Sequence, residues 1–459
     1  MTALRGVDPP DPGAKRYRDG THRVVDPEAT LRRVLPLARH LGVTRLANLT
    51  GLDRLGIPVA AAYRPNSRSL AVFQGKGATL AAAKASALME AAEAWHAERV
   101  TGPRLRGCHG ELVGRGVPAL DPGRLPRSAG AAGEPVSFAF DWVRGRDLRS
   151  GAVRWVPLDV VTADYTVGGP PAGPLQSTSH GLAAGNHLLE ALCHALCEVI
   201  ERDALALWRL LPDAAQDATA LDLATAPADL RHGLLARFAA AGVALRAFDV
   251  TSDVGVAAVL CLAMGDDDVE PQLGSGCHPD PAVALARAVA EAAQTRLTRI
   301  AGARDDLPPE SYDPARRAAR ARAARAWLGA TPPAGAGRDC LGLPRCGGAT
   351  IEADLAAMLN RLAAVGLDEV VWVDLADPAL GLPVVRVVVP GLEGVAAGQD
   401  ACRPGPRARE PRSRAESSSP DPSRPEPRRG SGQQGKEDMT LQIVDPGPDV
   451  ENSPANPLR

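Results

Sequence analysis

The polar and apolar positions of residues 177–204 follow the period of an α-helix preceded by a glycine-containing loop. Four polar side chains fall within an arc about 120° wide, at roughly 100° per residue. They are Asn186, Glu190, Glu198 and Glu201. The opposite side carries Leu188, Leu192, Leu196, Val199 and Ile200. The pattern therefore predicts an amphipathic helix with one carboxylate-rich face and one face for the core.

Two further segments predict helices with a polar stripe. The polar positions are Ser86, Glu90 and Glu93 in residues 83–98, and Arg287, Glu291 and Gln294 in residues 281–301. The turn-like sequence GSGCHPDP, residues 274–281, precedes the second of these helices. If the three helices converge on one site, they supply acids for metal ions and an arginine for phosphate.

The central helix has few positive charges to balance its acids. A solvated helix face usually interleaves lysines with glutamates four residues apart, but here only Arg202, at the edge of the arc, is basic. Hard oxygen ligands suit Mg²⁺, and Mg²⁺ usually arrives with a phosphate substrate. The pattern thus suggests a divalent-cation site, with a solvated surface helix as the alternative.

The rest of the pattern predicts an α+β chain. Further helices are expected at residues 27–41, 230–240, 313–328 and 351–365, and strands at 44–49, 58–63, 136–143, 153–158, 244–250, 255–264, 369–375 and 383–389. The valine-rich run that begins at Val384 predicts a strand buried on both faces.

Composition sets limits on location and partners. The chain has 459 residues, 45% of them hydrophobic, and a net charge of −2, so no global attraction to nucleic acid or to anionic membranes is expected. No apolar run approaches about 18 residues, and the start lacks the apolar core of a signal peptide. We therefore expect a cytoplasmic protein whose eight cysteines are reduced thiols.

Composition also divides the chain into three parts. Residues 1–19 are rich in proline, glycine and charge and predict a flexible arm. Residues 20–398 carry all the periodic segments and form the predicted catalytic domain. Residues 399–459 are rich in proline, arginine and serine, with almost no large apolar side chains, and predict a disordered tail.

Several single residues have two interpretations. Cys193 and Cys197 are four residues apart on a helix but lack a second zinc half-site, which favours core thiols over a metal pair. Cys340 and Cys346 flank a loop; the edge of a zinc site is one interpretation, and the absence of any site is the one we expect. His278 is either a general base or a histidine that completes its own turn.

The sequence FQGKGAT, residues 73–79, places a Gly-Lys-Gly step before a helix N-terminus, where backbone N–H groups favour anions. It lacks the full phosphate-loop pattern G-x-x-x-x-G-K-[ST]. Lys76 either lies near a phosphate, or its glycine neighbours only make a tight turn between strand and helix.

Three ordered motifs closely resemble those of the YcaO family. They are SALMEAAE at residues 86–93, G-L-A-A-G-N-x-x-x-E-A-x-x-x-A-L-x-E-x-x-E-R at 181–202, and A-x-x-R-A-V-x-E-A-x-Q-x-R at 284–296. The resemblance covers about residues 20–407. It implies a YcaO-type ATP-binding fold with mixed sheets and acidic-striped helices, unrelated to P-loop or protein-kinase nucleotide sites, with ATP and Mg²⁺ as cofactors.

The resemblance also assigns roles to individual residues. Metal binding is implied for Glu90, Glu93, Glu190, Glu198 and Glu201. Nucleotide binding is implied for Ser86, Asn186, Arg202, Arg287 and Glu291. Residues 20–65 resemble the TfuA-associated subfamily through the runs G-T-H-R, T-R, L-D and G-I-P-V, which adds Arg23 and Thr30 as nucleotide contacts. A surface arginine and a helix-start threonine are the alternatives for these two residues.

The sequence departs from the family pattern at one internal position and at its end, and only the departure at the end bears on the product. The chain has His180 where the family usually has asparagine, and it ends NSPANPLR where azoline-forming members typically end in P-x-P-x-P. A fragment of that pattern, Arg-Pro-Glu-Pro at residues 424–427, lies in low-complexity sequence.

The function implied by the resemblance is ATP-dependent O-phosphorylation of a backbone amide in a ribosomally made peptide, such as a bacteriocin, or a protein. With a TfuA-type partner the expected product is a thioamide. The alternatives are an azoline-forming cyclodehydratase with an E1-like partner, and a leader-peptide docking scaffold without turnover. A homodimer remains open, and no catalytic residue is assigned.

Overall fold

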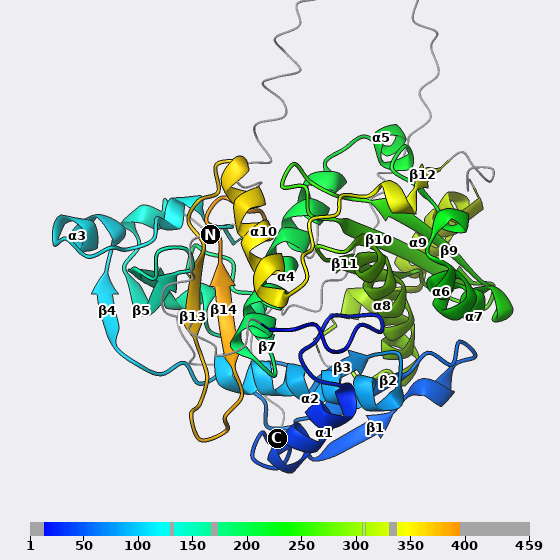
Figure 1. Ribbon diagram of the computed structural model, residues 1–459, viewed down its shortest axis with the longest axis horizontal. Helices are drawn as coiled ribbons and strands as arrows, with labels where there is room; N and C mark the ends of the chain where they lie inside the picture. Colours follow the sequence, from blue (N-terminus) through cyan, green and yellow to red (C-terminus); the bar gives the residue numbers. More distant parts are fainter. Residues whose placement is uncertain are drawn as a thin grey trace, which may run out of the picture.

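Two units with the same order of elements border the centre of the molecule, each an antiparallel three-stranded sheet followed by a long helix (Figure 1). The computed structural model describes residues 13–128, 133–166, 173–304, 306–307, 309–329 and 337–394. The first unit comprises β1 (Arg45–Asn48), β2 (Val59–Tyr63), β3 (Val72–Lys76) and α2 (Leu80–Ala97). The second comprises β9 (Val243–Asp249), β10 (Ala258–Gly265), β11 (Gln272–Cys277) and α8 (Pro281–Ala301).

Glycines on the last strand of each unit let the following helix pack very closely. A β-carbon at Gly75 would lie 2.1 Å from the backbone nitrogen of Ala87. A β-carbon at Gly274 would lie 2.2 Å from the backbone nitrogen of Ala292. Only glycine permits such an approach, so the glycines of β3 and β11 fix the distance of each helix from its sheet.

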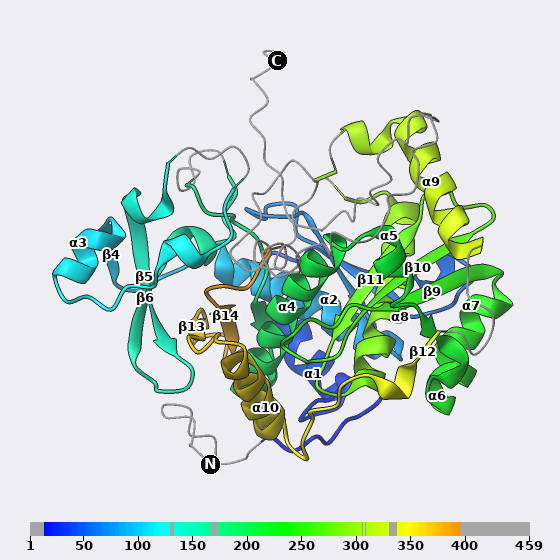
Figure 2. The same cartoon turned by 90° about the horizontal axis from the view of Figure 1, so that it is seen from above.

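The third long helix, α4 (Leu188–Arg209), packs on a six-stranded antiparallel sheet and on α10 (Ile351–Ala364). The strands of this sheet are β4 (Arg104–Gly107), β5 (Phe140–Asp147), β13 (Val371–Asp374), β14 (Val384–Val388) and β7 (Leu182–Ala184) in that order, with β6 (Val153–Pro157) paired to β5. All residues of β14 are buried, which confirms the predicted two-sided burial. The end of the sheet with β4 and α3 (His109–Gly114) lies away from α8 (Figures 1 and 2).

The remaining elements surround these layers. They are α1 (Pro27–Val34), α5 (Asp213–Asp217), α6 (Ala228–Leu230), α7 (Ala236–Ala240), α9 (Pro314–Gly329) and the parallel pair β8 (Leu221–Asp222) and β12 (Arg338–Asp339). A single turn of π-helix joins α6 to α7, so the helix predicted at residues 230–240 is present.

The helix predicted at residues 281–301 has the observed bounds of α8. Asp280 caps its start by accepting the N–H of Ala282, and Gly302 ends it in the left-handed conformation with φ of 59°. These are the residue types that favour a helix start and a helix end, and both were visible in the sequence.

Several other predicted elements were wrong in type or extent. The first helix ends as α-helix at Val34, because Pro36 lacks an N–H group and a 3₁₀ turn follows. The strand predicted at residues 136–143 is instead β5, and a 3₁₀ turn that begins at Pro135 precedes it. The predicted turn at residues 274–281 is strand as far as Cys277, paired with β10.

Asn186 does not lie on the central helix as predicted. The helix begins at Leu188 with His187 as its N-cap, so Asn186 belongs to the preceding loop. It still faces the helix, because its backbone N–H donates to Glu190 Oε2 at 2.9 Å.

The predicted arm and tail fall largely outside the described residues. Of the arm, residues 13–19 are described, and Lys15 is buried there against α10. The tail, residues 399–459, lies outside the described residues. Within the described part of the chain, no helix is both long enough and apolar enough to cross a membrane.

Candidate nucleotide and metal site

A cavity of about 640 Å³ lies among α2, α4 and α8, with β3, β11 and the segment before α1 completing its walls. Every residue that the sequence proposed for the site lines this cavity. They are Arg23, Thr30, Ser86, Glu90, Glu93, Asn186, Glu190, Glu198, Glu201, Arg202, Arg287 and Glu291. Three helices that are far apart in sequence thus present their polar stripes to one space.

Glu190 connects the central helix to the segment that carries Arg23. Its Oε1 accepts the backbone N–H of Val24 at 2.5 Å, and its Oε2 accepts that of Asn186 at 2.9 Å. The Asn186 amide also donates to Thr30 Oγ1 at 2.9 Å. These bonds hold Arg23 and Thr30 at the cavity wall, although both lie far from α4 in sequence.

Glu90 and Glu93 on α2 are half-buried carboxylates at the cavity wall with one backbone donor each. Gln74 N–H donates to Glu90 at 3.2 Å, and Ala184 N–H donates to Glu93 at 2.7 Å. Burial raises the pKa of Glu90 to about 7, although the Lys76 ammonium opposes this shift. Burial and the neighbouring Glu90 raise the pKa of Glu93 well above its usual value.

On α4, Glu198 and Glu201 face the other two helices. Glu198 accepts the backbone N–H of Gly181 at 3.1 Å, and Glu201 accepts the Ser275 hydroxyl at 2.7 Å. Arg202 Nη2 lies 3.7 Å from Glu198 and 3.9 Å from Glu201. Burial raises the pKa of Glu201, while Arg202 limits the rise.

The second unit contributes Glu291 and Arg287. Lys76 Nζ donates to Glu291 Oε2 at 2.8 Å. Burial raises the pKa of Glu291, but Lys76 and Arg202 outweigh it, so the net pKa lies below the usual value. Arg287 lies 3.3 Å from His194 Nδ1, and burial together with this guanidinium keeps the His194 pKa well below its usual value.

The residues of the cavity fit a magnesium–nucleotide complex. Seven glutamates line it, and the raised pKa values of Glu90, Glu93 and Glu201 mean that their charges need a cation beyond those the protein supplies. The buried Nε2 of Gln74 and Oε1 of Gln294 have no hydrogen-bond partner among the described residues, and both side chains line the cavity. The volume is within the roughly 300–1,000 Å³ typical of cofactor pockets.

Comparison with known proteins agrees with this chemistry. A family model described as YcaO cyclodehydratase, ATP- and Mg²⁺-binding, matches residues 74–393. The chain belongs to the YcaO family. ATP and Mg²⁺ are therefore its cofactors, and the α+β fold expected from the resemblance is confirmed.

One relative of the chain is a protein of a tfuA region. An uncharacterised protein in the tfuA 3′ region of Rhizobium leguminosarum bv. trifolii is 37% identical over 396 residues, which cover 84% of this chain and 91% of that protein. An uncharacterised protein of Methanothermobacter thermautotrophicus is 36% identical over 389 residues, covering 81% and 95%. The predicted likeness to the TfuA-associated subfamily is confirmed by the first of these.

Two solved structures have the same fold. The YcaO protein of Methanopyrus kandleri bound with AMPPCP and Mg²⁺ has a TM-score of 0.66 and 27% identity, covering 83% of this chain and 95% of that one. A heterocyclase in complex with substrate and cofactor has a TM-score of 0.67 and 25% identity, covering 87% of this chain. The match spans only 57% of the heterocyclase, so its whole activity is not carried over to this YcaO protein.

The structure adds residues that the motifs of this YcaO chain did not name. Lys76 reaches the cavity, which favours the first of its two interpretations, and Ser275 is in hydrogen-bond contact with Glu201. Both residues stand between two glycines, at the end of β3 and near the end of β11. The Gly-x-Gly step before each polar-striped helix was the available signal, because close strand–helix packing turns the middle side chain toward the site.

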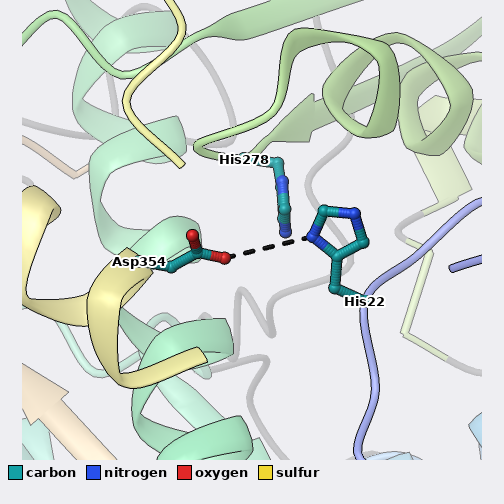
Figure 3. Close-up of side chains that lie close together, drawn as sticks. All are labelled: His22, His278 and Asp354. Atoms are coloured by element: carbon teal, nitrogen blue, oxygen red, sulfur yellow. Dashed lines mark ion pairs between the residues drawn. The ribbon is translucent and has the colours of Figure 1, made fainter. Parts of the chain in front are cut away.

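A second group of potential ligands lies next to the nucleotide cavity, where His22, His278 and Asp354 offer atoms within 4.8 Å of one another (Figure 3). Lys15 Nζ is 2.6 Å from Asp354 Oδ2 and already supplies a positive charge there. His278 Nδ1 accepts the N–H of Asp280 at 2.9 Å, so its proton is on Nε2 and that nitrogen has no lone pair for a metal. The group therefore fits an ion-paired anchor better than a metal centre.

The cysteines of the described residues are free thiols. Cys193 and Cys197 are buried free thiols on the core side of α4. Cys340 is buried and free, and its Sγ donates to the carbonyl of Asp222 at 3.3 Å. Among the described residues, none of these thiols belongs to a group with metal-ligand geometry.

Proposed function

We propose that this YcaO protein uses ATP and Mg²⁺ to activate a backbone amide of a ribosomally made peptide or protein, and that the product is a thioamide formed with a TfuA-type partner. The observation that carries the proposal is the convergence on one cavity of six of its glutamates, Lys76 and three of its arginines, which come from the segment before α1 and from β3, α2, α4 and α8. A magnesium-bound triphosphate needs both the acids and the cations of such a site.

The residues divide between metal and phosphate. Glu90, Glu93, Glu190, Glu198 and Glu201 would hold Mg²⁺, which neutralises phosphate charge when bound. The phosphates would be held by Arg23, Arg202, Arg287 and Lys76. The rest of the nucleotide, or the side chains that contact it, would be held by Ser86, Thr30, Asn186 and Glu291. In the proposed reaction a nucleophile adds to the amide carbon, and the oxyanion accepts the γ-phosphoryl group and then departs as phosphate.

Two observations support the thioamide over the azoline. The G-T-H-R segment of the TfuA-associated subfamily lies at the site, since Arg23 lines the cavity and Val24 donates to Glu190. The relative in the tfuA 3′ region spans 84% of this chain. An azoline enzyme uses a side chain already tethered beside the amide, whereas a thioamide enzyme must be handed sulfur, which gives a partner protein a role.

The test is a reaction of the full chain with a cognate peptide, ATP, Mg²⁺, the TfuA-type partner and sulfide, followed by mass spectrometry. Replacement of one oxygen by sulfur is expected. Loss of one water without any sulfur source, abolished when a Cys, Ser or Thr of the peptide is changed to Ala, would establish the azoline reaction instead. We propose that the reaction takes place in the cytoplasm, where ATP is available.

The non-catalytic scaffold predicts a different outcome in the same experiment. A protein that only docks a leader peptide has no physical need for buried carboxylates whose burial raises their pKa. Peptide binding without peptide-dependent release of phosphate would favour the scaffold. Phosphate release that requires both Mg²⁺ and peptide would exclude it.

A further inference from the structure

The cavity extends beyond the residues that were assigned above to the nucleotide and the metal. We call this part of the cavity the arginine end. Among the described residues, it is lined by Glu270, Leu273, Arg299, Arg304, Leu307 and Arg320. On α8, Arg299 follows Glu291 by eight residues, which places it about 12 Å further along the helix. The cavity therefore runs from a carboxylate-rich end to one where arginines predominate.

Three guanidinium groups surround one carboxylate at the arginine end. Arg320 Nη2 lies 2.7 Å and Arg317 Nε 2.8 Å from Glu270 Oε1, and Arg299 Nη1 lies 3.3 Å from Oε2. The Glu270 side chain is only 4% exposed, so it needs one cation to remain charged in the interior. One arginine would be enough to compensate the Glu270 charge. The other two arginines are not explained by that compensation.

The guanidinium groups at the arginine end are partly desolvated and repel one another. Burial lowers the pKa of Arg299, and Arg320 and Arg304 lower it further by repulsion, although Glu270 opposes the shift. Helix α9, which carries Arg317 and Arg320, has five arginines and no acidic residue. An anion at this end would relieve the repulsion, since guanidinium groups bind carboxylates in paired, charge-assisted hydrogen bonds.

We propose that the arginine end binds a carboxylate of the peptide substrate, an aspartate or glutamate side chain close to the amide that is modified. The inference rests on the proposed function, because that function brings a peptide to the carboxylate end. The two ends are about 12 Å apart, and an extended peptide covers about 3.3 Å per residue, so the acidic residue lies about three or four positions from the modified amide.

A nucleotide phosphate is the competing anion. Its natural partners, however, are the basic residues interleaved with the glutamates, since Lys76 contacts Glu291 and Arg202 lies beside Glu198 and Glu201. Phosphate at the arginine end would sit about 12 Å along α8 from those acids, beyond the reach of a shared metal ion.

The experiment uses the full chain with saturating AMPPCP and Mg²⁺ and a fluorescent hexaglutamate peptide, measured by polarisation. The variants Arg299→Gln and Arg320→Gln each leave two arginines on Glu270, so the fold should survive, which a thermal melt verifies. Each should weaken hexaglutamate binding about tenfold, the effect of losing one charge-assisted hydrogen bond. A hexaglutamine peptide should bind neither the variants nor the native protein.

The matched control is Arg322→Gln, which removes an exposed arginine two residues further along α9 and hence on the other side of the helix. Hexaglutamate binding that is unchanged in Arg299→Gln and Arg320→Gln, or weakened equally by Arg322→Gln, would overturn the inference. So would competition between hexaglutamate and AMPPCP, which would assign this end to the nucleotide. If the native protein did not bind AMPPCP, the proposed function would be contradicted instead. Failure of the inference and failure of the proposed function are therefore distinguishable.

Discussion

Lys76 Nζ lies 2.8 Å from Glu291 Oε2, and this contact joins the two sheet–helix units across the cavity. Lys76 ends the last strand of the first unit, and Glu291 stands on the helix of the second, 215 residues later. The Lys76 and Glu291 side chains are 18% and 28% exposed, so a bound anion can reach the ammonium while the pair is formed. The contact sets both the geometry and the charge of the nucleotide end.

Replacement of Lys76 by methionine should reduce nucleotide affinity more than it reduces stability. The variant removes a phosphate partner and leaves Glu291 without its strongest counter-charge, so AMPPCP binding should weaken at least about tenfold. The midpoint of thermal unfolding should change little, because the pair is partly solvated. Isothermal titration and a thermal melt provide the two measurements.

The control for this variant is Arg106→Met, which breaks the exposed pair with Asp141 far from the cavity. It should leave AMPPCP affinity unchanged. Equal affinities of the native protein and Lys76→Met would show that Lys76 only positions Glu291.

Replacement of Glu90 by glutamine keeps the side-chain shape but removes a charge needed for Mg²⁺. Peptide-dependent phosphate release should fall by at least about a hundredfold, and the Mg²⁺ concentration for half-maximal rate should rise. Glu134→Gln, at a side chain that is 70% exposed, is the matched control and should behave as the native protein. Native turnover and Mg²⁺ dependence in Glu90→Gln would remove this residue from the metal site.

The metal-free protein should lose stability as the pH rises. Burial raises the Glu90 pKa from 4.5 to about 7, so the native state binds more protons than the unfolded chain within that window. The free energy of unfolding therefore decreases as the pH rises through it, and Mg²⁺ with AMPPCP reverses the effect by binding the carboxylate. The rise in melting temperature on adding both ligands should be larger at pH 8 than at pH 6.

The same comparison in Glu90→Gln isolates the contribution of this residue, because glutamine does not titrate. The ligand-induced rise in melting temperature should differ less between pH 8 and pH 6 in the variant than in the native protein. A ligand-induced rise of equal size at both pH values in the native protein would contradict the raised Glu90 pKa.

Asp354 should be important for stability without holding a metal. Asp354 and Lys15 form an ion pair whose side chains are 1% and 2% exposed, and removing one partner of a buried pair costs about 3–5 kcal/mol. Asp354→Asn should lower the free energy of unfolding by about this amount, measured by urea denaturation. Nucleotide affinity should fall with it, since the segment that Lys15 anchors carries Arg23.

Asp267→Asn is the control, because that side chain is 79% exposed and its pair with Arg54 should contribute less than about 1 kcal/mol. Added Zn²⁺ should not stabilise the native protein. Stabilisation by Zn²⁺ that disappears in Asp354→Asn would instead establish a metal centre at His22, His278 and Asp354.

Gly75 should not tolerate even a methyl group. The β-carbon of alanine would lie 2.1 Å from Ala87 N, so Gly75→Ala must push α2 away from β3 and should destabilise by more than about 3 kcal/mol. Gly110→Ala is the matched control, because nothing lies within 4 Å of its added β-carbon and the residue is on a helix, where alanine is preferred. Thermal melts of the two variants measure the difference, and equal melting temperatures would contradict the close packing.

The sequence by itself determined the parts of the site that repeat with the period of a helix. The stripe of Glu90 and Glu93 on α2 and the bounds and caps of α8 follow from local spacing and from the preferences of single residues. The cofactors ATP and Mg²⁺ were implied by the resemblance of these segments to the YcaO motifs. Asn186 was placed on the wrong element, because a loop that precedes a helix can continue its period by chance.

Only the tertiary structure decided which charges meet. The contact of Lys76 with Glu291, the bond from Val24 to Glu190 and the arginines gathered on Glu270 join segments that are far apart in the chain. The glycines of residues 274–277 led to the prediction of a turn. These residues form a strand, because pairing with β10 satisfies their backbone hydrogen bonds and α8 packs directly upon them. Local periodicity records which face of an element is polar, whereas the partner of that face depends on strand pairing and helix packing between distant segments.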